Sequence, residues 1–524
     1  MNDGAMQPFA LTIDKLLVHA AKWHPDTEVI TARANGKNQR SSYARIRDRA
    51  LRLSGALARL GVRQGARVAT LAWNSQAHLE TWFAIMGMGA TCHTLNPRLT
   101  ADQTAWMLRQ SAADVLIVSA DLLPLAKQII AQASLQTVLV IDADGTEGIE
   151  AVQLLEDLLT SAEPDVAWGE FDETTSCGLC FTSGTTGQPK GVIYTHRSTY
   201  LHTLRLLQAD VMGITAQDVV LPVVPMFHAS AWGMPFAAPA VGAKLVLPGR
   251  QTDGASLARL IASEGVTVAS AVPTVWLGLV EHLETEGGEV PSLKRVIVGG
   301  SPMPPALMER IERRLGVIVQ TSWGMTELSP LGTIAPQYLS ARSAAHSGRP
   351  ALGIDLLLTD SLGRALPQQR GSEGHLRARG ASVIERYLGH DEPATDADGW
   401  FDTGDLARID ANGNLIVTGR SKDLIKSGGE WINPAQIEAI VGALPQVSLA
   451  AVVGRSDPKW GERPILLVEM RKDGNLTDAE LLASLQGHVA PWWIPDEVVR
   501  LAKMPTAATG KVDKMHLRSQ YGQM

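Results

Sequence analysis

The chain has 524 residues, a formal net charge of −7, and 45% apolar, 19% charged and 5% aromatic residues. A chain of this length exceeds what one hydrophobic core usually organises, so we expect two or more domains. The composition is that of an ordinary globular protein, and the negative net charge argues against a nucleic-acid-binding protein, which would normally be basic.

The N-terminus and the longest apolar stretch argue against export and membrane insertion. Residues 1–15 lack a basic region followed by an apolar run, so no secretory signal is expected. The longest apolar candidate, residues 235–248, is interrupted by glycine, proline and Lys244, so no transmembrane helix is expected. Only three cysteines occur in the chain, which favours a reducing compartment such as the cytoplasm.

Helix-like and strand-like segments alternate along the chain, as a mixed α/β protein requires. Leu53, Leu57 and Leu60 recur at helical spacing before Gly61, which predicts a helix that ends there. Further along, residues 177–181 (CGLCF) are typical of a buried strand. Their C-x-x-C pair, Cys177 and Cys180, has redox or zinc binding as an alternative, but no second pair or histidines follow at ligand spacing.

A strand–helix–strand unit follows in the middle of the chain. Residues 295–298 form an apolar strand that ends in two glycines, and residues 317–319 begin the next strand. Between them, a helix that stops at Gly316 is predicted by one apolar face, Leu307, Ile311 and Leu315.

Polar, Gly-rich residues gather in three segments, 182–191, 336–349 and 419–434. The last segment is the best candidate for a domain boundary. The roughly 100 residues after it contain their own strands, 449–453 and 465–469, and are enough for a small α+β domain.

The strongest motif is FTSGTTGQPKG at residues 181–191. Its small residues let backbone N–H groups and hydroxyls surround phosphate oxygens, and its lysine adds a positive charge. The pattern differs from the Walker motif, and the alternative is an ordinary surface loop. The residues expected to contact phosphate are Thr182, Ser183, Gly184, Thr185, Thr186, Gly187 and Lys190.

TSGTTGQPKG resembles the phosphate loop of the adenylate-forming superfamily, which includes acyl-CoA synthetases, luciferases and the adenylation domains of peptide synthetases. The resemblance covers nearly the whole chain and continues, in order, through WGMTE (323–327), GWFDTGD (399–405), GRSKD (419–423) and TGK (509–511). It implies an α/β fold. A large N-terminal domain, residues 1–420, would contain two mixed sheets flanked by helices plus a β-barrel-like part, and a small mobile α+β C-terminal domain would span residues 421–524.

The resemblance implies an AMP-forming carboxylate–CoA ligase that uses ATP, Mg²⁺ and coenzyme A. Attack of a carboxylate on the α-phosphate brings two anions together, so the site must neutralise charge and hold the partners in line. Glu327 and Thr182 are the implied Mg²⁺ ligands. Lys511 is expected to carry adenylation at the carboxylate and the α-phosphate, although Ala507 stands where many relatives have threonine.

Three further residues are implied as nucleotide contacts. Trp323 would offer an aromatic face to adenine, where the family usually has tyrosine, and the alternative is core packing. Asp405 would accept hydrogen bonds from the ribose hydroxyls, with Arg420 nearby, whereas TGD alone would be a common turn. The motif of Trp323 continues through Gly324, Met325 and Thr326 to the implied metal ligand.

Two half-reactions in one site require a rearrangement, which the family achieves by rotating the C-terminal domain. Lys422 matches the hinge position. The following loop resembles the segment that lines the pantetheine tunnel for coenzyme A, and its residues are Lys426, Gly428, Gly429, Glu430 and Trp431.

The acyl side is expected in residues 225–233 (PMFHASAWG). His228 stands where peptide-synthetase domains carry an aspartate for the substrate's amino group, so amino-acid activation is disfavoured. His228 would instead contact the carboxylate, or be a satisfied core histidine. Trp232 is expected to close an apolar slot of limited depth together with Val272, Gly299, Gly300 and Ser301.

The local sequence most resembles bacterial medium-chain acyl-CoA synthetases and 3-(methylthio)propionate–CoA ligases. One methylene or thioether changes binding by only about 1–3 kcal/mol, so both acids stay open. Three further functions stay open as well: an acyl-AMP ligase that loads a carrier protein, for which no carrier domain follows residue 524, a luciferase-like oxygenase, and a non-catalytic acyl or nucleotide sensor. A small-molecule carboxylate is the expected partner, and a homodimer is expected at family level only.

Overall fold

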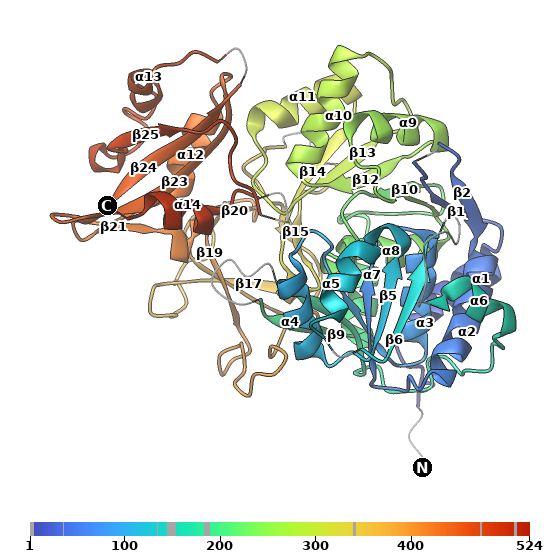
Figure 1. The fold of residues 1–524 in the computed structure, drawn as a ribbon. Coiled ribbons are helices and arrows are strands. Elements are labelled where there is room, and N and C mark those ends of the chain that lie inside the picture. The colour runs from blue at the N-terminus through green and yellow to red at the C-terminus, as the bar shows by residue number, and fades with distance from the viewer. Residues whose placement is uncertain are drawn as a thin grey trace.

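Two large sheets organise the N-terminal part of the computed structural model, which describes residues 5–34, 36–133, 135–143, 153–182, 189–338, 342–471, 474–507 and 511–523 (Figure 1). The larger sheet has nine strands, and its central strands pair in parallel. In sheet order the strands are β16 (Arg349–Pro350), β15 (Leu331–Ile334), β14 (Ile318–Gly324), β13 (Arg295–Val298), β12 (Val268–Ala271), β10 (Val219–Pro222), β11 (Lys244–Leu247), β1 (Glu28–Thr31) and β2 (Gln39–Ser42).

The second sheet has seven strands and is parallel except at one edge, where β8 and β9 form an antiparallel pair. This pair flanks residues 182–190, so the sheet carries the predicted phosphate loop at its edge. In sheet order the strands are β7 (Gln153–Leu154), β6 (Thr137–Ile141), β5 (Val115–Ser119), β3 (Arg67–Leu71), β4 (Thr91–Thr94), β8 (Ser176–Phe181) and β9 (Gly191–Thr195).

Helices fill the space between the two sheets and cover their outer faces. One buried apolar cluster joins both sheets to the helices between them, and two further clusters lie under the outer helices. The inner helices include α1 (Asp14–Trp23), α2 (Tyr43–Arg59), α3 (Gln76–Gly87), α7 (His196–Leu206) and α8 (Met234–Val241). The outer helices are α4 (Ala101–Ser111) and α5 (Leu123–Ile130) on the seven-stranded sheet, and α9 (Gly254–Glu264), α10 (Pro273–Thr285) and α11 (Pro305–Leu315) on the nine-stranded sheet. Helix α6 (Leu155–Ser161) packs near α2.

An antiparallel four-stranded sheet follows and completes the N-terminal part, which is expected to include a β-barrel-like part. It consists of β17 (Ile354–Thr359), β18 (Glu373–Gly380), β19 (Phe401–Ile409) and β20 (Leu415–Arg420). Exposed or half-buried residues alternate with buried ones along β19, and Asp405 is one of the buried residues.

The C-terminal region has its own sheet and its own apolar clusters, all built from residues after Ser421. Its strands are β21 (Ile425–Ser427), β22 (Glu430–Ile432), β23 (Val447–Asp457), β24 (Gly461–Met470) and β25 (Glu497–Arg500), and its helices are α12 (Pro434–Gly442), α13 (Asp478–Ala483) and α14 (Lys514–Tyr521). Figure 1 shows this region as a separate lobe beside the nine-stranded sheet.

The elements predicted from the sequence are confirmed. Helix α2 ends just before Gly61, α11 ends at Gly316 in a left-handed cap, and residues 177–181 lie in β8. Cys177 and Cys180 are buried and unpaired, and their sulfur atoms contact threonine hydroxyls. No helix in the described part of the chain is long and apolar enough to cross a membrane.

Candidate active site

The phosphate loop is closed at its base by two hydrogen bonds. The Thr182 N–H donates to the Lys190 carbonyl (2.9 Å), and the Lys190 N–H donates to Thr182 Oγ1 (3.1 Å). The pairing of β8 with β9 therefore brings the two ends of the loop together. The other predicted phosphate contacts, Ser183, Gly184, Thr185, Thr186 and Gly187, lie outside the described residues.

Tyr387 connects the loop base to the predicted metal carboxylate. Its hydroxyl donates to Glu327 Oε1 (2.9 Å), and Lys190 Nζ lies 4.7 Å from the centre of its ring. Glu327 is 8% exposed and lies in the single turn η3 (Thr326–Leu328). The tyrosine thus contacts both the loop lysine and the predicted metal carboxylate.

Two hydrogen bonds from distant segments hold the main chain around Glu327. The Tyr194 hydroxyl donates to the Thr326 carbonyl (2.8 Å), and the Ile384 N–H donates to the Glu327 carbonyl (2.8 Å). These contacts come from β9 and from the loop after β18, so two sheets meet at this turn. A carboxylate held in this way has little freedom to reorient, which suits a ligand of a demanding metal ion.

These residues fit Mg²⁺. Among the described residues no three His, Cys, Asp or Glu side chains gather as a metal cluster. Mg²⁺ is commonly held by one or two carboxylates, with phosphate oxygens and waters completing its octahedron. The carboxylate of Glu327 and the hydroxyl of Thr182 match that donor set.

Asp405 is the centre of the predicted nucleotide contacts. Its Oδ2 accepts from Trp323 Nε1 (2.8 Å), and its Oδ1 pairs with Arg420 Nε (2.7 Å). Burial raises the pKa of this 2% exposed carboxyl, and Arg420, Trp323 and Lys511 act in the opposite direction. The aspartate is therefore already oriented by two neighbours.

Trp323 is only 8% exposed, and part of its ring is covered by protein. A Cβ atom on Gly332 would overlap Trp323 Cζ3, so the glycine packs directly against the indole. The tryptophan therefore combines core packing with a polar contact to Asp405. Its role as an adenine-binding face stays a prediction, as do those of Gly324 and Met325.

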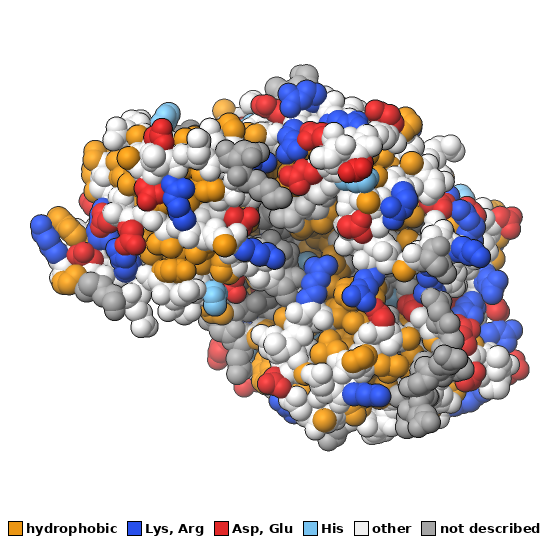
Figure 2. Space-filling view, turned by 45° about the horizontal axis from the view of Figure 1, so that its top comes forward, with side chains coloured by type: hydrophobic (Ala, Val, Ile, Leu, Met, Phe, Trp, Pro, Cys, Tyr) orange, Lys and Arg blue, Asp and Glu red, His pale blue; other side chains and the backbone are white. Residues whose placement is uncertain are grey.

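Lys511 comes from the C-terminal region and reaches the N-terminal part. Its backbone carbonyl accepts a hydrogen bond from the Ala507 N–H (2.7 Å). The residue as a whole is exposed to solvent. Desolvation of its ammonium, reinforced by the charges of Arg420 and Lys422, lowers the pKa of Lys511 to about 8, against the opposing effect of Asp405. Figure 2 shows the hollow between the two lobes.

His228 marks the acyl side of the same site. Burial lowers the pKa of His228 to about 4, and the charges of Lys511 and Arg98 act in the same direction. The imidazole is therefore neutral near pH 7 and donates or accepts a hydrogen bond without adding charge. The charge of Lys511 lowers the pKa of Asp405 as well, so it influences both the acyl side and the nucleotide side.

Four of the predicted acyl-slot residues converge. A Cβ atom on Gly299 would lie 3.2 Å from Trp232 Cη2, and one on Gly300 would lie 3.3 Å from Val272 Cγ1 and 3.8 Å from Trp232 Cζ2. The indole therefore lies directly over the two glycines, where a larger residue would displace it. Ser301 follows in the chain and is half-buried.

Trp232 lies in an unusual left-handed turn, η2 (Ala229–Gly233). The φ angles of its five residues are all positive, from 43° at Ala229 to 80° at Gly233. Left-handed backbone costs roughly 1–2 kcal/mol for each residue with a side chain, so such a run persists only where its surroundings hold it. Strain of this kind concentrates at functional sites.

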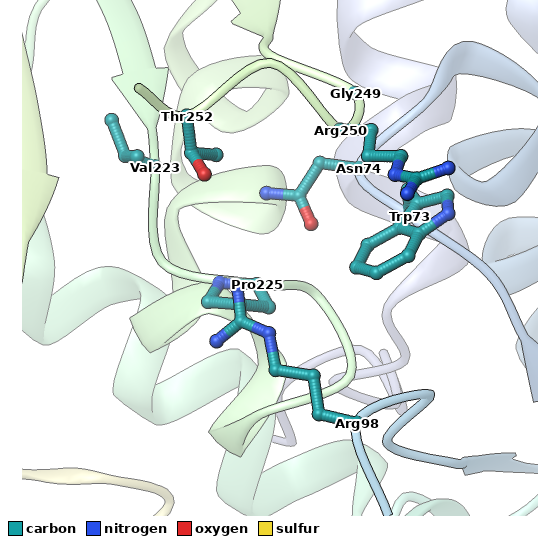
Figure 3. Close-up of a pocket in the computed structure, with 8 residues that line it drawn as sticks. All are labelled: Trp73, Asn74, Arg98, Val223, Pro225, Gly249, Arg250 and Thr252. Atoms are coloured by element: carbon teal, nitrogen blue, oxygen red, sulfur yellow. The ribbon is translucent and has the colours of Figure 1, made fainter. Parts of the chain in front are cut away.

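Asn74 fixes the segment that leads into this turn. Its Nδ2 donates to the carbonyls of Pro222 and Val224 (2.9 Å each), and its Oδ1 accepts from the Met226 N–H (2.6 Å). Behind the segment lies a cavity of about 20 Å³, shown in Figure 3, which has room for a water molecule but not for a substrate. Its lining residues are Trp73, Asn74, Arg98, Val223, Pro225, Gly249, Arg250 and Thr252.

The predicted coenzyme A segment lies away from this site. Lys426, Gly428, Gly429, Glu430 and Trp431 form the β21–β22 hairpin. It packs within the C-terminal region, where the Gly428 N–H donates to the Trp460 carbonyl (2.8 Å). Figure 1 places β21 on the side of that lobe that faces away from β14. The structure thus brings Lys511 to the site and leaves the hairpin outside it.

Sequence reasoning missed Tyr387, Tyr194 and Asn74. Each contacts a predicted site segment across 60 to 152 positions of the chain, and none stands in a motif that we recognised. Their contacts arise only when the sheets are assembled, so spacing along the sequence carries no signal for them.

Comparison with known proteins agrees with this geometry. Residues 17–388 match the family model "AMP-binding enzyme", and residues 436–511 match "AMP-binding enzyme C-terminal domain". A 3-methylmercaptopropionyl-CoA ligase of Ruegeria lacuscaerulensis is 39% identical over 99% of this chain and 98% of its own. A medium-chain-fatty-acid–CoA ligase of Ectopseudomonas oleovorans is 40% identical over 99% of this chain and 97% of its own.

A solved structure has the same fold over its full length. ATP-bound MatB from Rhodopseudomonas palustris superposes with a TM-score of 0.86 at 25% identity, over 98% of this chain and 99% of that one. Two family models in chain order and two relatives matched nearly end to end leave one conclusion: the chain belongs to the AMP-binding enzyme family.

Proposed function

We propose that the protein is an AMP-forming carboxylate–CoA ligase that acts on a small-molecule carboxylic acid. The observation that carries this proposal is the pair of oriented carboxylates, Glu327 held by Tyr387 (2.9 Å) and Asp405 held by Trp323 (2.8 Å) and Arg420 (2.7 Å), in a chain matched nearly end to end by two CoA ligases. The attack of a carboxylate on ATP also requires a positive group near the reacting anions, and we infer that Lys511 provides it.

In the first half-reaction, a carboxylate oxygen attacks the α-phosphorus of ATP. The new P–O bond forms as the bond to the β-phosphate breaks, and pyrophosphate leaves. Lys511 would stabilise the charge that builds up on the α-phosphate, and neutral His228 would orient the carboxylate without competing with it for positive charge. The loop closed by Thr182 and Lys190 would hold the departing phosphates.

Mg²⁺, when bound, supplies positive charge that neutralises the phosphate oxygens. Glu327 and Thr182 would hold it, with Glu327 kept in place by Tyr387 and by the Ile384 N–H. Contacts within the protein therefore hold the proposed metal ligands in position without help from a substrate.

In the second half-reaction, the sulfur of coenzyme A attacks the acyl carbonyl and AMP leaves. We infer that the C-terminal domain spans residues 421–524 and rotates at Lys422 between the two steps, which would withdraw Lys511 and bring the β21–β22 hairpin to the site. Contacts on either side support this pivot. His375 Nδ1 lies 3.1 Å from Ser421 Oγ, and Arg518 Nη2 lies 3.0 Å from Asp423 Oδ1.

The acid that the slot favours is of small to medium length. Trp232 lies over Gly299 and Gly300, which limits the depth available to an acyl chain. The relatives named for medium-chain fatty acids and for 3-methylmercaptopropionate are equally similar to this chain, and both acids fit a short apolar slot. A cytoplasmic location and a homodimer are further parts of the proposal, the first supported by three unpaired, buried cysteines.

ATP–pyrophosphate exchange with a panel of straight-chain acids and 3-(methylthio)propionate tests this function. Exchange that depends on the acid, followed by acyl-CoA formation when coenzyme A is added, is the expected result. Lys503→Ala provides a matched control, because Lys503 is an exposed lysine of the same region outside the site. Nucleotide binding without exchange for any acid would favour a sensor, and exchange with transfer only to a carrier protein would favour an acyl-AMP ligase.

A further inference from the structure

Helix α7 contacts the metal side and the acyl side of the site through two buried side chains. His202 and Arg205 lie three residues apart, on one face of the helix, and are 0% and 2% exposed. Neither residue belongs to a motif of the nucleotide or acyl site. Both point at segments that carry such motifs.

Arg205 and His202 together hold both backbone groups of Leu331. The Leu331 N–H donates to His202 Nε2 (3.3 Å), and Arg205 Nη1 donates to the Leu331 carbonyl (3.2 Å). Leu331 lies four residues after Glu327. The two side chains therefore fix the strand that leaves the turn with the metal carboxylate.

Arg205 also reaches the turn itself through Ser382. Its Nη2 donates to Ser382 Oγ (3.0 Å), whose hydroxyl in turn donates to the Leu328 carbonyl (3.2 Å). A further hydrogen bond runs from Arg205 Nε to the Leu352 carbonyl (3.0 Å). One planar guanidinium thus joins three separate segments, which a lysine ammonium cannot do with the same geometry.

No ion pair within the described ranges includes Arg205, although its guanidinium is buried. Burial lowers the pKa of Arg205 to about 10, which reflects the cost of keeping a charge there. A buried charge held only by carbonyls and a hydroxyl destabilises the fold relative to an apolar side chain of the same size. A requirement for orientation at the turn explains its presence.

His202 contacts the acyl side through Gly233. A Cβ atom on Gly233 would lie 2.7 Å from His202 Cε1 and 2.8 Å from Nδ1, so the glycine packs directly on the imidazole. Gly233 ends the left-handed turn and follows Trp232. His202 Nε2 accepts a hydrogen bond, so Nδ1 carries the proton, and it has no partner in the described part of the chain.

We propose that His202 and Arg205 are positioning residues that fix Trp232 and Glu327 relative to each other. This inference rests on the proposed function, because the acyl slot and the metal carboxylate that it links are parts of the proposed ligase site. His202 acts through the turn that presents the indole, and Arg205 acts through the turn that presents the carboxylate. Acyl preference and metal–nucleotide binding are then linked through one helix.

The test uses the full-length protein with His202→Asn, Arg205→Lys, Ser382→Ala and the matched control Leu204→Ala, which changes an exposed residue of the same helix. Three quantities are measured: pyrophosphate exchange over a chain-length series, Mg²⁺-dependent binding of α,β-methylene-ATP by calorimetry, and the melting temperature. Calorimetry reports on the site without turnover, so it separates positioning from loss of active protein.

Arg205→Lys should weaken binding of the ATP analogue in the presence of Mg²⁺ by about tenfold and leave the preferred chain length unchanged. Ser382→Ala should weaken the same binding by a smaller factor. His202→Asn should move the preferred chain length, and its effect should not add to that of Trp232→Ala, because both act on one turn. Leu204→Ala should match the wild type in all three measurements.

Variants that lose only melting temperature, with unchanged analogue affinity and chain-length preference, would overturn the inference. If Arg205→Lys fails to fold, unchanged analogue binding by Ser382→Ala overturns the Arg205 assignment. An unchanged chain-length optimum in His202→Asn overturns the assignment of His202. Wild-type protein that exchanges pyrophosphate with no acid would instead contradict the proposed function itself.

Discussion

At the scale of single residues, the site depends on a few charges placed between two substrates that are both anionic. Lys511 acts on Asp405 and His228, and Lys190 lies by Tyr387 and Glu327. Each lysine is therefore coupled to a carboxylate of the nucleotide side. Removal of one lysine should affect the half-reaction in which its charge is needed and leave the other half-reaction unchanged.

Lys511→Ala should collapse adenylation and leave thioesterification of a supplied acyl adenylate largely intact. In the proposed mechanism the lysine would meet both the carboxylate and the α-phosphate, and the second step would need neither contact. Single-turnover assays of the two half-reactions measure this, with Lys503→Ala as the control. An equal fall of both steps at unchanged folding would show that Lys511 does not serve adenylation alone.

The pKa of Lys511 predicts how adenylation depends on pH. A pKa lowered to about 8 means that the free enzyme loses the required positive charge as the pH rises through 8, so kcat/KM for adenylation should decline there. Bound phosphates would raise that pKa, so kcat should decline at higher pH. His228, with a pKa of about 4, should add no change near neutrality.

Lys511→Arg is the control for this pH dependence. Arginine stays protonated throughout the range, so the residual activity of that variant should lack the alkaline decline. A decline that persists unchanged in Lys511→Arg would assign it to another group.

Trp232→Ala should shift the acyl preference toward longer or bulkier acids. The indole lies over Gly299 and Gly300, so its removal opens the end of the slot. An acid that filled the native slot should lose roughly 10- to 200-fold in kcat/KM, and each added methylene should recover about 0.8 kcal/mol. A chain-length series at saturating ATP and coenzyme A measures the shift, and the KM for ATP should hardly change.

If kcat/KM falls for all acids and the preferred chain length does not move, Trp232 is a packing residue. If kcat/KM for short acids is unchanged and long acids are still excluded, another residue limits the depth of the slot, and Val272 and Ser301 are the next candidates.

At the scale of elements, the single turn η4 (Ser421–Asp423) joins the two lobes. Ser421 is held by His375 of β18, and Asp423 is held by Arg518 and, at 3.9 Å, by Lys514 of α14. One side of the turn thus belongs to the N-terminal part and the other to the C-terminal part. We propose that a rotation that keeps both anchors takes place at the backbone of Lys422.

Lys422→Pro should therefore slow thioester formation strongly and leave adenylation in place. Proline fixes φ near −65° and removes the freedom that a rotation at this residue needs. Lys422→Ala removes the side chain but keeps that freedom, so it separates backbone from side-chain effects. Acyl adenylate should accumulate in the proline variant, and unimpaired overall turnover would exclude Lys422 as the pivot.

At the scale of the whole molecule, the sequence predicts the elements and the order of the motifs better than the contacts between them. Apolar periodicity and glycine caps identify α2, α11 and β8, because these signals are local. The contact of Trp232 with Gly299 and Gly300 could be predicted only through the resemblance to a family. The roles of Tyr387 and Arg205 could not be predicted, because their partners lie 60 to 177 positions away and meet them only across assembled sheets.

The measurement that tests the proposed function most directly is a product balance with ATP, Mg²⁺, coenzyme A and a panel of medium-chain acids and 3-(methylthio)propionate. Chromatography quantifies adenine nucleotides and acyl-CoA in the same sample, and an enzymatic assay quantifies pyrophosphate. An AMP-forming carboxylate–CoA ligase predicts AMP, pyrophosphate and acyl-CoA in equal amounts, all dependent on the acid and abolished in Lys511→Ala. Formation of ADP and phosphate, or AMP without acyl-CoA for every acid, would contradict it.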